Sequence, residues 1–318
     1  MDAKIKRFLT AAVLLLVVIG VERVTGVDVL EWLEGASSAQ PVAEVQTSLP
    51  EVDPSTARVV TWNLYNFGQS KNDGEIAFIA ETLRDADVVA VQEVSTGPAG
   101  AQAVGRLDRE LDRKGFAWDY RVSDPTTGDG SERYAFLWKP SRLRLIGTPW
   151  LEESLASTID REPFCARFEH RETGQTFLVT SIHAVPTSKD PEHEIARLDR
   201  LHHAYEDDHL VVLGDFNLDE DHEAFDALRT LGYVHVLNDQ KTSLRRKRQS
   251  GPSGHLSEEY DNIFVESAPL QPVRTGVVDF TRSFSSLKQA RDISDHLPVY
   301  VDLSWSTPAR SAAIQPAP

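Results

Sequence analysis

The sequence contains very little cysteine, with one thiol, Cys165, in 318 residues. A single cysteine excludes an internal disulfide, and it excludes a zinc site built from several thiolates. We expect Cys165 to be a buried core residue, because free cysteine usually packs as a small hydrophobic side chain. A catalytic thiol is the alternative, although no flanking pattern supports it.

Positive charge is also in short supply, since 33 Lys and Arg residues face 49 Asp and Glu residues for a net charge of −16. This balance argues against a general nucleic-acid coat or a binder of anionic lipids. It does not exclude a nuclease, because a bound divalent cation or a local basic loop reverses the field at one site. Apolar content of 41% and charged content of 26% are typical of a globular protein with a sizeable core.

Long hydrophobic runs are scarce, and the apolar stretch at residues 8–21 is shorter than the ~20 residues of a membrane-spanning helix. It follows Lys4, Lys6 and Arg7, and a basic head before an apolar run is typical of an export signal. We therefore expect residues 1–34 to be a signal peptide or a membrane anchor, with a buried helix as the alternative. The protein would then be secreted, periplasmic or anchored to the membrane.

The domain boundaries follow from changes in composition. Residues 35–57 are rich in Ala, Ser, Gln, Pro and Glu without a period, which predicts a linker. Residues 306–318 have the composition of a disordered tail. Between them, residues 58–305 alternate strand-like and helix-like segments, with helices expected at 74–83, 101–114, 191–205 and 222–231. This alternation predicts one catalytic domain with a sheet-rich, mixed α/β layered fold.

The segment VVLGDFN at residues 211–217 carries the first candidate site. It reads as a buried strand that ends at Gly214, and Asp215 and Asn217 then point to the same side. Carboxylate and carboxamide oxygens are hard ligands that suit Mg²⁺, Ca²⁺ or Mn²⁺. The alternative is an ordinary strand-to-turn junction, in which Asp and Asn are favoured.

Similar polar groups follow other apolar strands. They are Asn63, Glu93, His183, Asp295 and His296. Sites in layered α/β folds collect at strand ends, so we expect these side chains to converge. A divalent cation relieves the repulsion between neighbouring carboxylates, and imidazoles transfer protons near neutral pH. Taken singly, each residue could instead be a turn former, a helix cap or a buried core histidine.

Six ordered segments carry a resemblance to a known family. They are TWNLYNFG (61–68), VVAVQEV (88–94), SIHAVP (181–186), VVLGDFNLD (211–219), YDNIF (260–264) and ISDHLPV (293–299). The chain resembles the metal-dependent endonuclease/exonuclease/phosphatase superfamily, and within it the secreted deoxyribonuclease I-like branch. The resemblance implies a four-layer α/β/β/α sandwich, in which two packed mixed sheets are flanked by helices.

The resemblance also implies a role for each matching residue. The catalytic set would be His183, His296, Asp215, Glu132 and Asp261, in which Glu132 and Asp261 orient the two histidines. The metal set would be Asn63, Glu93, Asp215, Asn217 and Asp295, which would hold Mg²⁺, with Ca²⁺ or Mn²⁺ as alternatives. Arg161 and Asn217 would contact the scissile phosphate. The implied activity is hydrolysis of phosphodiester bonds in DNA or RNA; a lipid or small phosphate ester is the alternative substrate.

The chain departs from the family pattern where duplex DNA would be gripped. Ser95 and Gly130 stand where the deoxyribonuclease I-like branch places an arginine and a tyrosine in the minor groove. The basic segment 241–248 offers Arg245, Arg246 and Arg248 as substitute phosphate contacts, or it is a solvated loop. The aromatic residues that could stack a base are Trp62, Tyr65 and Phe67, with Trp62 expected in the core. No protein partner is indicated, and we expect a monomer.

Overall fold

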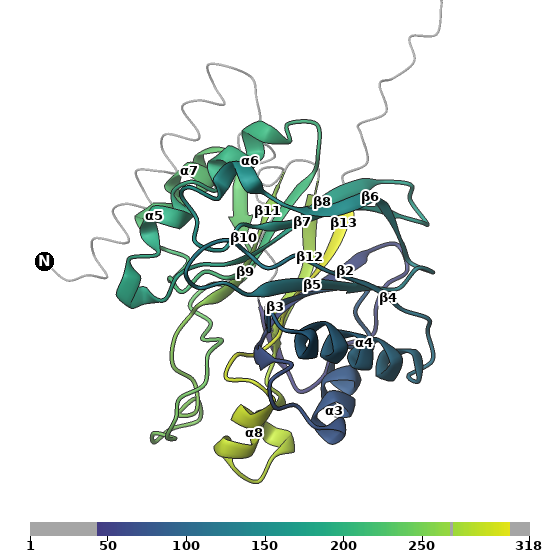
Figure 1. Ribbon diagram of the computed structural model, residues 1–318, viewed down its shortest axis with the longest axis vertical. Coiled ribbons are helices and arrows are strands. Elements are labelled where there is room, and N and C mark those ends of the chain that lie inside the picture. Colours follow the sequence, from purple (N-terminus) through teal and green to yellow (C-terminus); the bar gives the residue numbers. More distant parts are fainter. Residues whose placement is uncertain (1–42, 268–269, 306–318) are drawn as a thin grey trace, which may run out of the picture. The chain divides into compact units, whose positions relative to one another are not determined.

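The computed structural model describes residues 43–267 and 270–305, and Figure 1 shows two β-sheets packed face to face with helices outside them. The predicted signal peptide or anchor at residues 1–34 and the predicted tail at 306–318 lie outside the described residues. Within the described part, no helix combines the length and the apolar character that crossing a bilayer requires.

The first sheet has seven strands and contains the beginning and the end of the described chain. Its order is β1 (Glu44–Gln46), β12 (Leu270–Val278), β13 (Val299–Trp305), β2 (Ala57–Phe67), β3 (Val88–Val94), β5 (Arg133–Trp138) and β4 (Asp119–Val122). Strands β2 and β3 pair in parallel, as do β1 and β12, whereas the other pairs are antiparallel.

The second sheet has six strands. Its order is β10 (Tyr233–His235), β11 (Asp261–Glu266), β9 (Leu210–Asp215), β8 (Thr176–His183), β7 (Phe164–His170) and β6 (Leu143–Leu151). The pair β8–β9 is parallel and the other pairs are antiparallel, so both sheets are mixed. A parallel pair thus lies inside each sheet, which places two neighbouring carboxyl ends at one edge of each.

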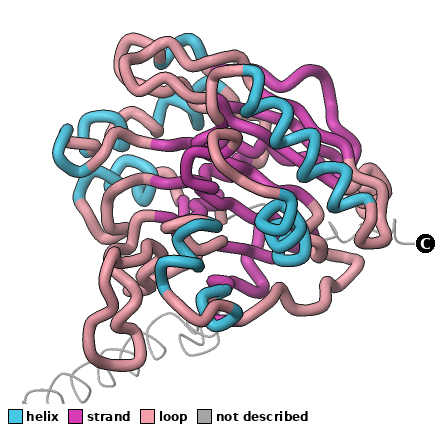
Figure 2. Tube along the Cα trace, turned by 60° about the horizontal axis from the view of Figure 1, so that its bottom comes forward, coloured by secondary structure: helices cyan, strands magenta, loops and turns pink. Residues whose placement is uncertain are grey.

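Helices cover the outer faces of both sheets (Figures 1 and 2). The first sheet carries α3 (Asp73–Leu83) and α4 (Pro98–Asp112), and α8 (Leu287–Ile293) lies next to α3. The second sheet carries α5 (Glu192–Ile195), α6 (Asp199–Ala204) and α7 (Asp226–Thr230). Single 3₁₀ turns occur at Glu153–Leu155, Thr187–Lys189, Glu223–Phe225 and Phe280–Ser283. The predicted four-layer α/β/β/α sandwich is confirmed.

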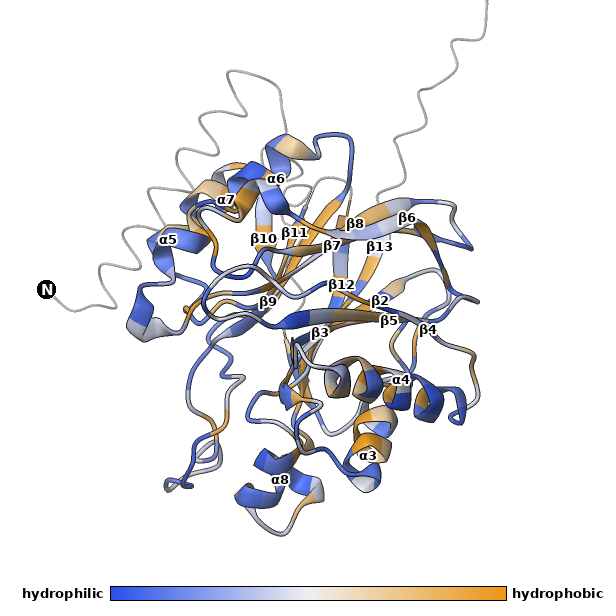
Figure 3. Ribbon diagram, viewed as in Figure 1, coloured by the Kyte–Doolittle hydropathy of each residue, from blue (hydrophilic) through white to orange (hydrophobic). Residues whose placement is uncertain are grey.

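Apolar side chains hold the layers together, and Figure 3 shows the hydrophobic colour concentrated on the strands. The rings of Phe136 in β5 and Phe164 in β7 stack across the two sheets with centroids 5.0 Å apart. Cys165 is buried as expected, and burial raises the pKa of its thiol to about 12. A thiol with so high a pKa is a core residue and not a nucleophile.

The structure corrects two boundary predictions. The predicted linker 35–57 is wrong in its later part, because β1 pairs with β12 and Leu49 is buried in the core. The predicted helix 191–205 is two helices, α5 and α6. Between them the backbone makes tighter bonds, from Arg197 N to Glu194 O and from Leu198 N to Ile195 O, so the α-helix is interrupted.

Candidate active site

The carboxyl ends of β8 and β9 bring two predicted catalytic residues together. His183 and Asp215 are neighbours in register at the ends of these parallel strands. Gly214 has φ +142°, and a Cβ at this position would lie 1.9 Å from the backbone oxygen of Ile182. Only glycine allows the strands to approach this closely, so the glycine before Asp215 determines where the carboxylate stands.

The other sheet supplies Asn63 and Glu93. Asn63 lies inside β2 and not after it, at the point where the register between β2 and β3 shifts, and Glu93 is the next-to-last residue of β3. The buried Nδ2 atom of Asn63 donates to Glu93 Oε1 and to Asp215 Oδ2, and both distances are 3.0 Å. One carboxamide of β2 therefore bonds to the neighbouring strand β3 and to β9 of the other sheet. Three of the five predicted metal residues are brought together in this way.

Glu93 has an unusual backbone conformation. Its φ is +60°, in the left-handed region that residues other than glycine seldom adopt. The Glu93 N–H donates to Glu132 Oε1 at 3.0 Å, and Glu93 Oε2 accepts from Asn66 N at 2.7 Å. Strained backbone conformations are common at functional sites. In this conformation the Glu93 carboxylate points toward Asn63 and accepts its hydrogen bond.

Each candidate catalytic histidine is held by its expected carboxylate. His183 Nδ1 lies 2.9 Å from Glu132 Oε2, and His296 Nδ1 lies 2.7 Å from Asp261 Oδ2. The opposite ring nitrogens, the two Nε2 atoms, lie 3.5 and 3.6 Å from one oxygen, Asp215 Oδ2. The two imidazoles, which are 113 residues apart in the chain, therefore converge on one carboxylate.

These carboxylates make both imidazoles more basic. Burial acts to lower the pKa of His183, but the charge and hydrogen bond of Glu132 outweigh burial and raise it above its ordinary value. Burial acts in the same direction on His296, and the charges of Asp261 and Asp215 outweigh it and raise that pKa to about 10. The neighbouring carboxylates therefore stabilise the imidazolium form of each ring, the form that a ring reaches when it accepts a proton and from which it can donate one.

Arg161 is part of the wall of the site. Its Nη1 atom donates to the backbone oxygens of His183 and Ala184 at 2.8 and 2.9 Å, and its Nε donates to Gly130 O at 2.9 Å. The Nε atom also lies 3.3 Å from Glu132 Oε2. Among the residues that the structure describes, Nη2 has no partner, so the predicted phosphate contact would use this nitrogen.

Asn217 follows Asp215 by two residues and bonds to its carboxylate. Its backbone N–H donates to Asp215 Oδ1 at 3.0 Å, and its Nδ2 donates to Ala184 O at 3.1 Å. Asn217 has φ +52°, which asparagine tolerates better than most side chains. The first bond orients the Asp215 carboxylate, and the second holds the Asn217 side chain. The predicted contacts of Asn217 with metal and phosphate stay predictions.

The donors around Asp215 suit a hard cation. Ligand atoms of Asp215, Asp261 and His296 lie within 4.8 Å of one another. Within the part of the chain that the structure describes, the Oδ1 atoms of Asp261 and Asp295 are buried without a hydrogen-bond partner. Buried, unpaired carboxylate oxygens are unfavourable, and a divalent cation such as Mg²⁺ satisfies them. The residues present therefore fit a divalent metal ion.

Asp295 is paired with a cation. Its Oδ2 atom forms an ion pair of 2.9 Å with Arg291, and its backbone oxygen accepts from Leu244 N. Its Oδ1 atom is the one that a cation could use, and the predicted metal role stays a prediction.

The predicted basic segment begins a loop that projects beside α8 in Figure 1. Residues 242–244 are buried at its base, and Ser243 forms a β-bridge with His296. Arg245 is half-buried. The exposed cations of the loop are Arg246, Lys247 and Arg248, which lie between the cross-loop bonds from Arg245 N to His255 O and from Gln249 N to Gly254 O. The loop therefore connects a basic surface to a candidate catalytic histidine.

Several side chains that hold His296 and Asp261 were not predicted as site residues. Thr242 Oγ1 donates to Asp261 Oδ2 at 2.6 Å and accepts from Asp261 N. Ser294 Oγ accepts from His296 N at 3.0 Å. Trp62 is buried as expected, and its indole N–H also donates to His296 O at 2.8 Å. Of these, Ser294 had the clearest sequence signal, because it lies inside the ISDHLPV segment.

A cavity of about 310 Å³ opens directly beside the candidate catalytic groups. Glu93, Glu132, Arg161 and His183 line one side of it. The other lining residues are small or uncharged: Asn66, Gln69, Val94, Ser95, Thr96, Gly130 and Ser131. Space for a substrate group therefore adjoins the groups that could react with it.

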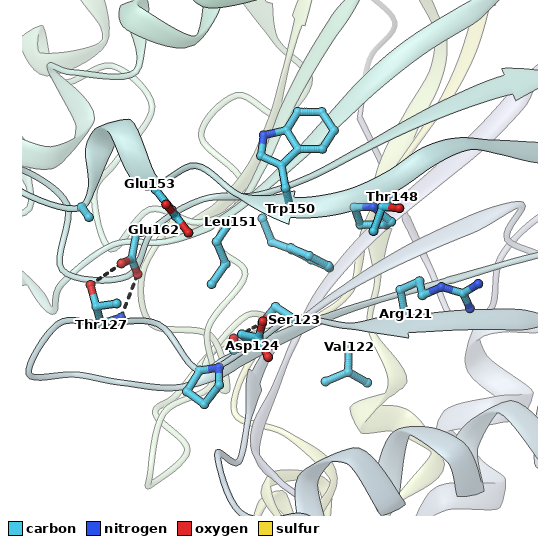
Figure 4. Close-up of a pocket in the computed structure, with 14 residues that line it drawn as sticks. Arg121, Val122, Ser123, Asp124, Thr127, Thr148, Trp150, Leu151, Glu153 and Glu162 are labelled. Carbon is cyan, nitrogen blue, oxygen red and sulfur yellow. Dashed lines mark hydrogen bonds between the residues drawn. The ribbon is translucent and has the colours of Figure 1, made fainter.

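A larger cavity of about 830 Å³ lies between the edge strands β4 and β6 (Figure 4). Trp150, Leu151 and Arg121 line it, whereas neither His183 nor His296 does. The loop that carries Gly130 to Glu132 borders both cavities, and the Thr127 amide and hydroxyl hold it to the Glu162 carboxylate. The candidate active site is therefore at the smaller cavity.

Comparison with known proteins gives relatives of low sequence identity. The chain is 28% identical over 278 residues to a protein named deoxyribonuclease from Thioalkalivibrio sp. (strain K90mix), over 81% of this chain and 74% of that protein. It is 29% identical over 246 residues to deoxyribonuclease-1-like 1 of Sus scrofa, over 71% of this chain and 73% of that protein.

The fold has counterparts among solved structures. A crystal structure of an endonuclease/exonuclease/phosphatase family protein from Bacteroides thetaiotaomicron matches with a TM-score of 0.61 and 20% identity, over 80% of this chain and 100% of that chain. Residues 60–296 match the Endonuclease/Exonuclease/phosphatase family, and this range contains every candidate catalytic residue. The chain therefore belongs to the Endonuclease/Exonuclease/phosphatase family.

Proposed function

We propose that this protein is an exported, divalent-metal-dependent endonuclease that hydrolyses phosphodiester bonds of DNA, with RNA as a second polymer to test. The observation that carries the proposal is the approach of two imidazole Nε2 atoms to one oxygen, Asp215 Oδ2, at 3.5 and 3.6 Å. The names of the relatives from Thioalkalivibrio and Sus scrofa, both deoxyribonucleases, support DNA as the substrate.

The reaction is in-line attack of water on phosphorus, in which one P–O bond forms and the P–O bond to the leaving nucleotide breaks. Glu93 and Asn63, with Asp215 and Asp295 as further donors, would hold a divalent ion, which would neutralise charge at the phosphate. Of His183 and His296, one accepts the proton of the attacking water and the other donates a proton to the leaving oxygen.

The remaining residues of the site position these groups. Asp215 orients the attacking water between the two imidazoles through its Oδ2 atom. Glu132 and Asp261 keep each ring in one orientation and stabilise its protonated form. Arg161 Nη2 contributes a hydrogen bond to a phosphate oxygen, a charge-assisted contact that is stronger than a neutral one. Ordered donors aimed at developing charge are usually the largest catalytic contribution.

Incubation of the purified full-length chain with supercoiled plasmid DNA and Mg²⁺ tests this proposal. We expect nicked and then linear products, no products with a chelator, and restored activity when Mg²⁺ is added back. Parallel incubations with a phosphoinositide vesicle and with a soluble phosphate ester test the alternative substrates. Phosphate release from those substrates with intact plasmid would overturn the nuclease proposal and favour a phosphatase.

Export is proposed from the basic head and apolar run of residues 4–21. Expression of the full-length chain in a bacterial host, followed by fractionation, tests it. We expect the protein in the medium, the periplasm or the membrane fraction. N-terminal sequencing of that product distinguishes a cleaved signal from a retained anchor. Recovery of the whole chain from the cytosol would contradict export.

A further inference from the structure

The wall of the 310 Å³ cavity differs from what a duplex-gripping nuclease requires. Side chains that hold a DNA groove must protrude from the protein surface. Here Ser95, Thr96 and Gly130, which have short side chains or none, are among the residues that line the cavity. The surface is therefore concave at the position where a groove-binding side chain would protrude. A duplex laid across this position would leave the hollow unfilled.

The hollow at Gly130 is fixed by its neighbours. Gly130 N donates to Asp160 Oδ2 at 2.8 Å, and a Cβ on Gly130 would lie 2.4 Å from this oxygen and 3.0 Å from Arg161 Nη2. The N–H of Asp160 is in turn bound to Glu194 Oε1 at 2.7 Å. A larger residue at position 130 would require the side chains of Asp160 and Arg161 to shift beside the catalytic groups, so the arrangement of this wall fits glycine and not a groove-reading side chain.

An exposed aromatic residue adjoins, in the chain, a residue that lines the same cavity. Tyr65 is 41% exposed, whereas Trp62 and Phe67 are fully buried. Tyr65 directly precedes Asn66, which lines the cavity, and its N–H donates to the Asn63 side chain at 2.9 Å. Of the three aromatic residues that the sequence offered for base stacking, Tyr65 is therefore the one that a substrate can reach.

The backbone holds Tyr65 in place. Tyr65 and Asn66 have φ of +43° and +51°, two successive residues in a region that side-chain-bearing residues rarely adopt. The Asn66 N–H is bound to Glu93 Oε2 at 2.7 Å, so the strained turn is attached to a metal-site carboxylate. The Lys71 ammonium lies 6.0 Å from the centre of the Tyr65 ring. Strain retained at an exposed ring indicates that the position of the ring matters.

We propose that the cavity beside Glu93 is a subsite for one unpaired nucleotide, with Tyr65 as its stacking platform. The preferred substrate is then a single strand or an unpaired position in a duplex. A cavity of 310 Å³ lies at the lower end of the ~300–1,000 Å³ range of ligand pockets. The amides of Asn66 and Gln69 offer donors and acceptors to a base edge, and aromatic rings stack bases of any sequence.

The inference rests on the proposed nuclease function, and substrate comparison tests it directly. One oligonucleotide is offered to the full-length protein as a single strand, as a perfect duplex, and as a duplex with one unpaired nucleotide. We expect a higher kcat/KM for the single strand than for the perfect duplex, and cuts in the third substrate next to the unpaired nucleotide.

Variants assign this preference to the proposed residues. Tyr65→Ala should raise KM for the single strand by about 5- to 100-fold, as expected for loss of one base–aromatic stack, and leave kcat nearly unchanged. Tyr65→Phe should restore KM. Thr96→Trp, which fills the cavity from an exposed position, should raise KM without any change at Tyr65. Phe116→Ala, at an exposed aromatic residue outside the cavity lining, is the matched control.

The outcomes separate this inference from the proposed function. Duplex cleavage as fast as single-strand cleavage, with unchanged KM in Tyr65→Ala and Thr96→Trp, overturns the subsite and leaves the nuclease in place. If no DNA is cleaved, the nuclease proposal fails. Binding of a fluorescent single strand, measured by its anisotropy, then tests whether the subsite exists. Binding that Tyr65→Ala weakens would support the subsite, and the absence of binding would overturn it.

Discussion

The Oε1 atom of Glu132 accepts a hydrogen bond of 3.0 Å from the backbone N–H of Glu93. The other oxygen of Glu132, Oε2, holds His183 Nδ1 at 2.9 Å. One carboxylate thus connects a candidate metal ligand to a candidate proton carrier. A shift of the Glu93 backbone is therefore transmitted to the imidazole through a single side chain.

Glu132→Gln should slow turnover by about 10- to 100-fold, the range usual for partners that orient site residues. The carboxamide can keep one of the two contacts, but it lacks the charge that stabilises the imidazolium of His183. Initial rates on plasmid DNA with Mg²⁺ measure the effect, and circular dichroism checks the fold. Glu153→Gln, at an exposed glutamate of the larger cavity, is the control. A normal rate in Glu132→Gln would show that His183 needs no charged partner.

His183→Ala and His296→Ala should each lower kcat by about 10²- to 10⁴-fold, because each removes a group that transfers a proton in the transition state. The double variant should be little slower than either single variant, since the two rings act on one reaction step. Single-turnover rates separate this effect from changes in binding. His193→Ala, at an exposed histidine of α5, is the control. Rates near wild type in either variant would reject the roles assigned to the two rings.

The sequence was sufficient to find the strand-end residues of the site. A buried strand followed by a glycine and a carboxylate is a local pattern, and the Gly214 contact with Ile182 shows why it is needed. The convergence of strand ends follows from general properties of layered sheets, so Asn63, Glu93 and Asp215 could be placed together before their contacts were known. The resemblance added the pairing of each histidine with its carboxylate, which no spacing in the sequence specifies.

Contacts between distant segments explain what the sequence missed. Strand β1 has three residues, and it exists because it pairs with β12, more than two hundred residues later. Thr242 lies in a segment that composition marks as a basic loop, yet its hydroxyl contacts Asp261 in β11. Residues 191–205 have apolar side chains at helical spacing. This spacing continues across the tight turn that separates α5 from α6, so it could not predict the interruption. Local patterns do not contain these features.

Thr242→Val should slow turnover roughly 10-fold, because it removes a 2.6 Å hydrogen bond to the oxygen of Asp261 that also holds His296. Valine keeps the shape of threonine, so the buried base of the loop should remain packed. Thr242→Ser retains the hydroxyl and should restore most of the rate, which a purely structural role for the methyl group would not predict. Equal rates for Thr242→Val and wild type would show that Asp261 is oriented without this hydroxyl.

Neutralising the exposed cations of the basic loop should weaken DNA binding and reduce the dependence of that binding on salt. Each phosphate contact contributes about 0.7 to 0.9 to the slope of log K against log salt concentration. Changing Arg246, Lys247 and Arg248 to Gln should therefore flatten the slope by up to about 2 to 3. Binding of a fluorescent oligonucleotide by His183→Ala at several salt concentrations gives the slope. Changing Lys288, an exposed cation of α8, to Gln is the control. An unchanged slope would show that these three cations do not contact the phosphate backbone.

Asp108 in α4 should make the protein less stable as pH rises. Burial, followed by the charges of Asp112 and Asp119, raises its pKa to about 6, and its Oδ1 atom is buried with no hydrogen-bond partner among the described residues. Between pH 3.8, the ordinary pKa of an aspartate, and about pH 6, the folded state therefore holds a proton that the unfolded state has lost. Stability contributed by this group is present below that window and is lost as pH increases through it.

Asp108→Asn should consequently raise Tm at pH 7.5, where the wild-type carboxylate is charged, and change it little at pH 4, where wild type is already neutral. Thermal unfolding followed by circular dichroism at both pH values measures the difference. Asp124→Asn, whose side chain is 98% exposed in the wild type, should leave Tm unchanged at either pH. A lower Tm for Asp108→Asn at pH 7.5 would mean that the charged form is stabilised in the folded protein, contrary to its burial beside two other acids.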